Sequence, residues 1–281
     1  MGLGAARFVA GPTVEEGLAM LRQLENEGYR TYAIELGEDV VTREDVQRTV
    51  DDYAQLLGLL HREGLRSTIS IKLSNLGLAF SEDLAYSSAR HVLAAADAVG
   101  KFVRIDMEGS SLVDPTLSIY RRLRSEGIAN VGVVIQAYLH RAQDDLRSLL
   151  PLEPNVRLVK GAYLEPATIA HPRKRNVDAN YRALIDIALD EASFTAVATH
   201  DEKLIEYAKH RAASYGRDAG SEFEYQMLLG VRPALQKSLV EDGYPLRICV
   251  PFGAEWFTYL VRRLAERPAN LLFGLQSVVR R

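Results

Sequence analysis

Glycine recurs at the end of the helical segments of this chain, and a short β-branched run follows each one. The glycines stand at Glu27-Gly28, Glu63-Gly64, Val99-Gly100, Glu126-Gly127 and Asp242-Gly243. Glycine ends helices readily because it takes the left-handed conformation without a steric clash. The first four of these glycines are 36, 36 and 27 residues apart. A period of this size, with helix and strand alternating, predicts repeated βα units and a parallel sheet.

The β-branched runs predict eight strands. They lie at 31–36, 67–72, 102–107, 131–138, 156–161, 194–199, 222–228 and 246–250. Eight strands, each followed by a helix, indicate an α/β protein with a (βα)₈ barrel, distorted or regular, as one domain over residues 1–281. A doubly wound sheet is the rival architecture, but it usually has fewer strands. An extra N-terminal helix at 13–27 precedes the first strand and is expected to cover the bottom of the barrel.

Two polar pairs predict where helices begin. Thr13 and Glu16 have the spacing of a capping box. Asp114 followed by Pro115 predicts an N-cap with proline at the first helical position. Composition adds exclusions: a net charge of −3 gives no strong attraction to nucleic acid, and the single Cys249 excludes an intrachain disulfide framework. No apolar run is long enough for a membrane span or a signal peptide.

The predicted strand ends are unusually polar, at the end of a barrel where chemistry takes place. The residues concerned are Lys72, Asp106, Glu108, Gln136, Lys160, Tyr163, Thr199, His200, Asp201, Glu224 and Gln226. Each has a structural alternative, such as a helix cap, an ion pair or a solvated side chain. Barrel interiors are mostly filled by apolar layers, so a polar ring at one rim predicts a functional site.

Three chemistries fit such a rim. A Schiff-base aldolase would use Lys72 or Lys160 as its nucleophile. A metal hydrolase would draw ligands from His200, Asp106 and Glu108, but no HxH or HExxH motif supports it, so no metal is expected. The third is a redox barrel that holds a flavin, which needs no GxGxxG motif. A binding barrel without catalysis is the non-enzymatic alternative.

A helix over residues 256–266 places two guanidiniums side by side. Helical spacing puts Tyr259, Arg262 and Glu266 on one stripe, with Arg263 about a hundred degrees round. Paired arginines bind a carboxylate well, since each planar fork donates two parallel hydrogen bonds. The alternative is a solvated basic patch with an ion pair to Glu266.

Seven segments together resemble the proline dehydrogenase family, monofunctional bacterial type. They are SIKLS (70–74), RIDME (104–108), VIQAYL (134–139), RLVKGAY (157–163), ATHD (198–201), FEYQML (223–228) and YLVRRLAE (259–266). All seven occur in order, each at a predicted strand end or on the final helix. The resemblance implies a distorted (βα)₈ barrel with non-covalent FAD. It also implies oxidation of L-proline to Δ1-pyrroline-5-carboxylate by hydride transfer to flavin N5, with electrons passed to a membrane quinone.

The resemblance assigns roles to substrate-side residues. Arg262 and Arg263 match the pair that clamps the proline carboxylate, Lys72 is a third cation, Asp106 orders the site and Glu266 orients the arginines. Residues that match the walls around the proline ring are Tyr259, Tyr163, Ala162 and Leu228. Cys249 departs from the family, since many members carry tyrosine at this position over the substrate. A smaller side chain there leads us to expect room for a substituted ring such as hydroxyproline.

The resemblance also assigns residues to the binding of the FAD cofactor. Arg157 resembles the arginine near flavin N5, and the remaining matched contacts are Gln136, Val159, Lys160, Gly161, Thr199 and His200. The basic run Arg173-Lys174-Arg175 precedes a helix predicted at 177–191, and cations at a helix start suit a pyrophosphate. The implied partners are L-proline, a quinone and Δ1-pyrroline-5-carboxylate dehydrogenase, with no nucleic acid. The implied location is cytoplasmic and peripheral to the inner membrane.

Overall fold

A computed structural model describes residues 7–37 and 40–257 of the chain. Helices and strands alternate along it. The elements are α1 (Val14–Asn26), β1 (Arg30–Glu35), α2 (Arg43–Arg62), β2 (Thr68–Ile71), α3 (Glu82–Ala98), β3 (Val103–Ile105), α4 (Val113–Ser125), β4 (Val131–Gln136), α5 (Ala142–Leu149), β5 (Asn155–Val159), α6 (Lys174–Glu191), β6 (Phe194–Ala198), α7 (Glu202–Ser214), β7 (Phe223–Leu228), α8 (Pro233–Glu241) and β8 (Leu246–Phe252). Short helical segments at Ser74–Leu78, Ser110–Leu112 and Leu150–Leu152 complete the set.

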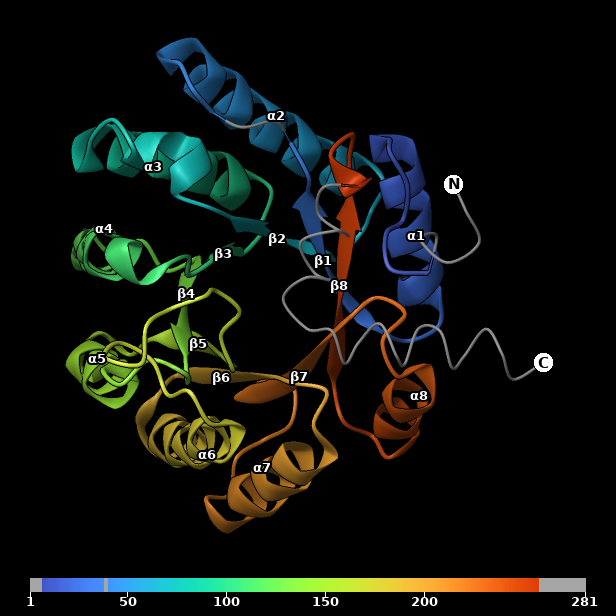
Figure 1. Ribbon diagram of the computed structural model, residues 1–281. Helices are drawn as coiled ribbons and strands as arrows, with labels where there is room; N and C mark the ends of the chain where they lie inside the picture. Colours follow the sequence, from blue (N-terminus) through green and yellow to red (C-terminus); the bar gives the residue numbers. More distant parts are fainter. Residues whose placement is uncertain (1–6, 38–39, 258–281) are drawn as a thin grey trace.

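The eight strands form a closed parallel barrel in sequence order, with β8 paired to β1 (Figure 1). Closure is extensive, since the β1–β8 register runs without a break from Arg30 opposite Arg247 to Glu35 opposite Phe252. The predicted (βα)₈ barrel with an extra N-terminal helix is confirmed. All eight predicted strands are present, and the largest boundary errors fall at the carboxyl ends. There β3, β4 and β5 end two residues earlier than predicted, and β8 ends two residues later.

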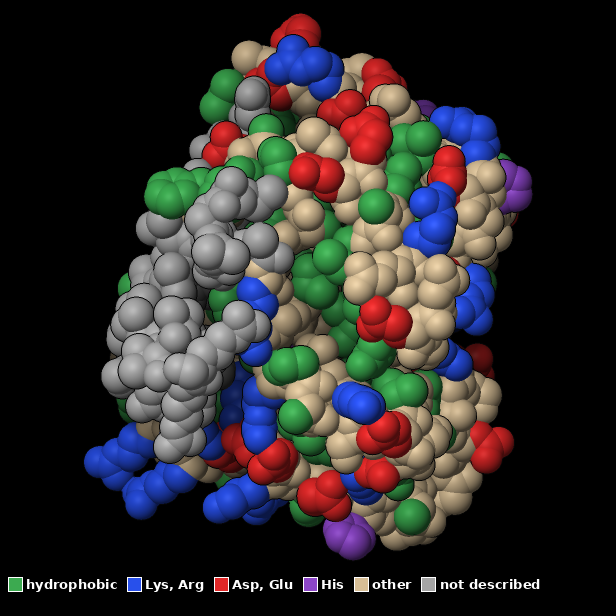
Figure 2. All heavy atoms as spheres, turned by 90° about the vertical axis from the view of Figure 1, so that its right-hand side faces the viewer, with side chains coloured by type: hydrophobic (Ala, Val, Ile, Leu, Met, Phe, Trp, Pro, Cys, Tyr) green, Lys and Arg blue, Asp and Glu red, His purple; other side chains and the backbone are tan. Residues whose placement is uncertain are grey.

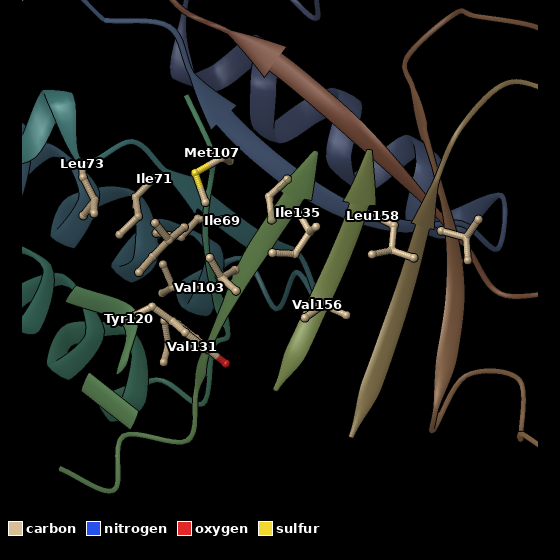
Figure 3. Close-up of a cluster of buried hydrophobic side chains, with 14 of the residues drawn as sticks. Ile69, Ile71, Leu73, Val103, Met107, Tyr120, Val131, Ile135, Val156 and Leu158 are labelled. Atoms are coloured by element: carbon tan, nitrogen blue, oxygen red, sulfur yellow. The ribbon is translucent and has the colours of Figure 1, made fainter. Parts of the chain in front are cut away.

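Apolar side chains on alternate strand positions face the helices. Figure 3 shows a cluster of them from β2 to β5, close to Tyr120 of α4. Tyr120, Ile69 and Val156 are among the fully buried side chains of the main core. The β-branched runs therefore form strands because one face of each packs against the surrounding helices.

The helix ends follow the predicted signals with one exception. Gly28 and Gly64, with φ of +90° and +65°, are two of the five punctuating glycines, all of which adopt positive φ. Thr13 and Glu16 form the reciprocal capping box. The prediction that Asp114 caps α4 is wrong: α4 begins at Val113, because the short helical segment Ser110–Leu112 leads directly into it.

Helix α1 packs along the outer wall of the barrel, against β1 and β8, and this corrects the expectation that it covers the bottom (Figure 1). Gly17 of α1 lies so close to the ring of Phe252 that an added Cβ would approach it within 2.6 Å. At the other end of the helix, the Thr31 hydroxyl donates to Glu25 at 2.8 Å. The helix therefore runs from the carboxyl end of β8 to the start of β1.

The barrel interior is polar along its whole length. This corrects the premise that apolar layers fill it beneath a polar rim. Arg157 on β5 contacts Ser70 on β2, and Glu224 on β7 contacts Arg30 on β1, so these side chains meet through the interior. Only a closed sheet brings such non-adjacent strands together, which is why single strands did not reveal the network.

Charged side chains of both signs are interspersed over the face shown in Figure 2, as expected for a net charge of −3. Within residues 7–37 and 40–257, no helix combines the length and apolarity that crossing a membrane requires.

Candidate active site

Most predicted site residues lie where strands end at the carboxyl side of the barrel. Gln136, Val159 and Leu228 are the last residues of β4, β5 and β7. Others follow a strand within four residues, and these are Lys72, Asp106, Glu108, Lys160, Gly161, Ala162, Tyr163, Thr199 and His200. Parallel strands of a closed barrel end at one rim, so the topology brings these positions together as predicted.

Arg157 is the most firmly held of them. It is buried within the barrel, and its Nη1 donates to Asp106 Oδ1 at 2.7 Å while Nη2 donates to the Ser70 hydroxyl at 3.1 Å. The guanidinium carbon lies 4.4 Å from the centre of the Tyr32 ring. Burial works against the charge, but Tyr32 and Asp106 outweigh it and raise the pKa of Arg157. Three strands other than its own thus fix this cation.

Glu108 joins the ends of β2, β3 and β4. The Ser74 hydroxyl donates to its carboxylate at 2.6 Å, and the Ser74 N–H donates at 3.1 Å. The Gln136 amide donates to the Glu108 carbonyl oxygen at 2.8 Å. Glu108 therefore braces the rim, and its carboxylate is occupied by Ser74.

Two lysines and two aspartates form a charged cluster at the start of α6. Lys160 Nζ lies 2.6 Å from Asp178 and 2.8 Å from Asp201, and Lys174 contacts the same two carboxylates. Burial raises the pKa of Asp178, but the two ammonium groups outweigh it and hold that pKa below its usual range. Helix α6 starts at Lys174, three residues before the prediction, so Arg173 is its N-cap.

His200 connects the ends of β6 and β7. Its Nε2 accepts a hydrogen bond from the Leu228 N–H at 2.9 Å, which places the ring proton of the neutral imidazole on Nδ1. Its carbonyl oxygen accepts from Arg232 at 2.9 Å. The neighbouring Thr199 hydroxyl accepts from the Asp201 N–H at 3.2 Å. These bonds fix the loop after β6 through its backbone.

The loop after β5 contains a sterically restricted glycine followed by solvent-exposed apolar residues. Gly161 has φ of +101°, and an added Cβ would lie 2.0 Å from the Tyr138 ring, so only glycine fits. Ala162 is half-buried, whereas Tyr163 and Leu164 are 41% and 99% exposed. This loop brings apolar surface to the edge of the site.

Cys249 lies inside the barrel on β8, opposite Tyr32 of β1 in the sheet register. Both are buried, and the two side chains lie close enough to interact electrostatically. Burial raises the pKa of Tyr32 well above its usual value, and Arg157 opposes this shift. The side of the barrel next to Cys249 thus already holds an aromatic ring from a neighbouring strand.

Four predicted residues, Tyr259, Arg262, Arg263 and Glu266, lie outside the described part of the chain. Their roles stay predictions.

Sequence reasoning missed three partners. Tyr32 and Ser70 contact Arg157, and Asp178 contacts Lys160 and Lys174. Period-two alternation offered a signal for Ser70, since it shares a strand face with Lys72. The i,i+4 spacing offered one for Asp178 and Lys174. No local pattern links β1 to β5, so Tyr32 had none.

The arrangement of these side chains can be compared with the needs of a metal hydrolase and of a Schiff-base aldolase. Within the described ranges, no group of three or more His, Cys, Asp or Glu side chains has a metal-binding arrangement. A Schiff-base lysine needs its amine free to attack the substrate, whereas Lys160 Nζ lies in ion pairs with Asp178 and Asp201. The buried cation at the base of the rim favours a site for an electron-rich or anionic group.

Comparisons with known proteins identify relatives over most of the chain. The family model described as proline dehydrogenase matches residues 18–274. The chain is 41% identical to proline dehydrogenase 1 of Bacillus subtilis, covering 99% of this chain and 92% of that protein. It is also 41% identical to the proline dehydrogenase of Deinococcus radiodurans, covering 98% and 90%.

Solved structures show the same fold. Proline utilization A from Bdellovibrio bacteriovorus, inactivated by N-propargylglycine, superposes with a TM-score of 0.86 at 24% identity, covering 93% of this chain and 32% of that one. Proline utilization A from Corynebacterium freiburgense gives 0.81 at 22% identity, covering 98% and 32%. The chain therefore spans about a third of these larger proteins. Taken with the family model and the bacterial relatives, the comparisons show that the chain belongs to the proline dehydrogenase family of oxidoreductases.

Proposed function

We propose that this protein is a single-domain, FAD-dependent dehydrogenase that oxidises L-proline to Δ1-pyrroline-5-carboxylate, the first step of proline catabolism. Family membership supports proline oxidation and a flavin. The observation that carries the proposal is the Asp106–Arg157 pair, held by Ser70 and Tyr32 at the base of the polar rim. A fixed buried cation at the base of this rim suits a large, electron-rich ring system.

The donor set around the rim fits an FAD. Arg157 and Gln136 offer a buried guanidinium and an amide, both fixed by other hydrogen bonds. We assign the pyrophosphate to the start of α6, where Arg173 makes no side-chain cap and Lys174 lies in the first turn. The free N–H groups of a helix start attract phosphate oxygens. Lys160, Val159, Gly161, Thr199 and His200 complete the proposed contacts.

We assign the substrate to the same rim, above Arg157. Arg262 and Arg263 clamp the proline carboxylate, oriented by Glu266, and Lys72 adds a third cation. Tyr259, Tyr163, Ala162 and Leu228 surround the apolar ring of proline. Lys72 directly follows β2, and Leu228 ends β7, so their positions support a pocket over the barrel mouth.

The protein supplies placement and electrostatics in this reaction. A bound flavin would accept a hydride from Cδ, the ring carbon next to nitrogen that does not bear the carboxylate, and the amine proton would pass to solvent. Arg157 holds positive charge beside the reacting atoms, and Asp106 keeps the guanidinium in one orientation. The apolar ring contacts exclude water and orient the substrate.

Turnover of L-proline by the purified protein tests the function. With an artificial electron acceptor under anaerobic conditions, we expect Δ1-pyrroline-5-carboxylate and reduced acceptor in equal amounts. Absence of product with FAD present would contradict the proposal. A lysine–substrate adduct trapped by borohydride would instead support an aldolase.

We propose that Cys249 widens the range of substrates to include hydroxyproline. A tyrosine at this position would lie beside Tyr32 and crowd the interior, whereas Cys249 leaves room for a hydroxylated ring. We therefore expect wild type to use hydroxyproline relative to proline better than Cys249→Tyr does. Measured kcat/KM ratios that are the same in both proteins would refute this role.

For electron transfer, we propose a membrane quinone as the acceptor, which places the working enzyme at the cytoplasmic surface of the inner membrane. We propose that a separate Δ1-pyrroline-5-carboxylate dehydrogenase consumes the product. The relative named bifunctional protein PutA of Escherichia coli is 30% identical, and the chain covers 24% of its length. Faster reduction of a quinone than of dioxygen by the proline-reduced enzyme would support this acceptor; the reverse would contradict it.

A further inference from the structure

A polar cavity lies at the amino-terminal end of the barrel, opposite the candidate active site. It has a volume of about 240 Å³ and is bordered by residues at the starts of the strands. Arg30, Asn155 and Phe194 are the first residues of β1, β5 and β6, while Arg247 is the second residue of β8. The cavity is roomy enough for a small ion together with water.

Positive charge exceeds negative charge around this cavity. Arg30, Arg104, Arg157 and Arg247 line it, and Glu224 is the carboxylate among its lining residues. Glu224 is already shared, since it lies 3.1 Å from Arg30 and 2.5 Å from Arg247. The counter-ion of Arg157 is Asp106, nearer the active site. This leaves two positive charges in excess, and Arg104 is the lining arginine for which the described residues provide no ion pair.

Arg104 is buried, and its hydrogen-bond partners among the described residues are uncharged. Its Nη1 donates to the carbonyl oxygens of Asn155 at 2.7 Å and Val133 at 3.2 Å, and its Nη2 donates to the Asn155 side chain at 2.5 Å. Gly132 makes room for it, because an added Cβ would lie 2.3 Å from Nη1. Burial lowers the pKa of Arg104 to about 9, with Arg157 adding to the effect, so the group is still cationic at pH 7.

Buried polar atoms along the cavity also lack partners. Among the described residues, Arg104 Nε, Arg157 Nε and Gln226 Oε1 are buried and make no hydrogen bond, and all three residues line the cavity. Leaving a buried donor or acceptor unpaired destabilises the folded state. Two unpaired guanidinium donors in an electropositive cavity call for an acceptor with negative charge, and the Gln226 acceptor calls for a hydroxyl.

We propose that the amino-terminal end of the barrel is a binding site for a small protonated oxyanion of the hydrogen phosphate class, held by Arg104 with Arg30 and Arg247 beside it. The oxyanion accepts hydrogen bonds from the guanidiniums, and its hydroxyl donates to Gln226. It provides the excess cation with a counter-ion. The site is separate from the cofactor and substrate positions at the carboxyl ends of the strands.

Calorimetric titration of the FAD-loaded protein with inorganic phosphate tests the site. Bound FAD fills the proposed pyrophosphate position, and saturating cyclopentanecarboxylate occupies the proposed carboxylate clamp. Sodium chloride at matched ionic strength is the control titrant. We expect saturable binding of about one phosphate per chain and a rise in Tm with phosphate that chloride does not reproduce.

Three variants locate the binding. Arg104→Met removes the excess cation, and we expect phosphate affinity to fall by about tenfold or more. Thr68→Met fills the cavity from β2 without changing charge, and it should weaken binding even if Arg104→Met does not fold. Arg66→Met is the matched control, since this arginine is exposed at the same end but outside the cavity lining. Absence of saturable binding in wild type, or equal affinity in Thr68→Met and Arg66→Met, would overturn the proposal.

Discussion

At the scale of single residues, Arg157 decides what the active-site end can bind. Its guanidinium is anchored by Asp106, Ser70 and the Tyr32 ring, so its charge has one place and one orientation. Because the guanidinium is already oriented, no free energy is spent on reorienting it when a ligand binds. The same residue also borders the cavity at the amino-terminal end, so it lies between the two ends of the barrel.

Replacing Asp106 tests this arrangement. Asp106→Asn keeps the shape but removes the negative partner 2.7 Å from Arg157. We expect kcat/KM for proline to fall by about tenfold to a hundredfold, the effect of losing a charge-assisted hydrogen bond worth roughly 1.5–3 kcal/mol. Asp97→Asn, on the exposed surface of α3, should leave steady-state kinetics unchanged. Identical kinetics in both variants would show that the pair has no part in the site.

At the scale of elements, α1 closes the wall of the barrel where β8 meets β1. Its contact depends on Gly17, since any Cβ there would meet the ring of Phe252. Helix propensity alone would favour alanine over glycine at an interior helical position by about 0.5–1 kcal/mol. Packing and propensity therefore oppose each other at this residue.

Two glycine-to-alanine changes separate these effects. In Gly17→Ala, the clash at 2.6 Å with a buried ring should lower the free energy of unfolding by about 1–3 kcal/mol, as overpacking does. Gly58→Ala on α2 meets only the flexible end of Arg62 at 3.4 Å, so it should raise stability by about 0.5–1 kcal/mol. Urea denaturation of both variants measures this. Stabilisation by Gly17→Ala would mean that α1 packs elsewhere.

The elements were largely predictable from sequence, and the contacts between them were not. Strands and helices follow from local signals such as Gly28 and the capping box of Thr13, which act within a few residues. The rim positions followed because parallel strands end together. The pairing of Arg157 with Tyr32 depends on barrel closure, and the charge excess at Arg104 depends on which strands it faces. Neither is encoded by spacing along one strand.

At the scale of the whole molecule, one acid makes stability depend on pH. Burial, aided by the nearby Asp52, raises the pKa of Glu35 to about 7. The folded state therefore binds this proton more tightly than the unfolded state, whose carboxyl has an ordinary pKa near 4.5. Its contribution to stability is greatest below pH 4.5 and is lost as pH rises through 7.

Glu35→Gln should remove this dependence. Relative to wild type, we expect little change in the free energy of unfolding at pH 4 and a gain of about 1–3 kcal/mol at pH 8. Chemical denaturation across this range measures the difference. The exposed Glu191→Gln provides the comparison for the loss of a surface carboxylate. A gain that is the same at both pH values would show that Glu35 does not titrate in this way.

The whole barrel has two polar ends, and the central claim is that its carboxyl end holds a flavin which proline reduces. Anaerobic titration of the purified protein with L-proline, followed by visible absorbance, tests that claim most directly. We expect a yellow protein with oxidised-flavin bands that bleach as about one proline per flavin is added. A protein that takes up no flavin, or a bound flavin that stays oxidised at saturating proline, would contradict it.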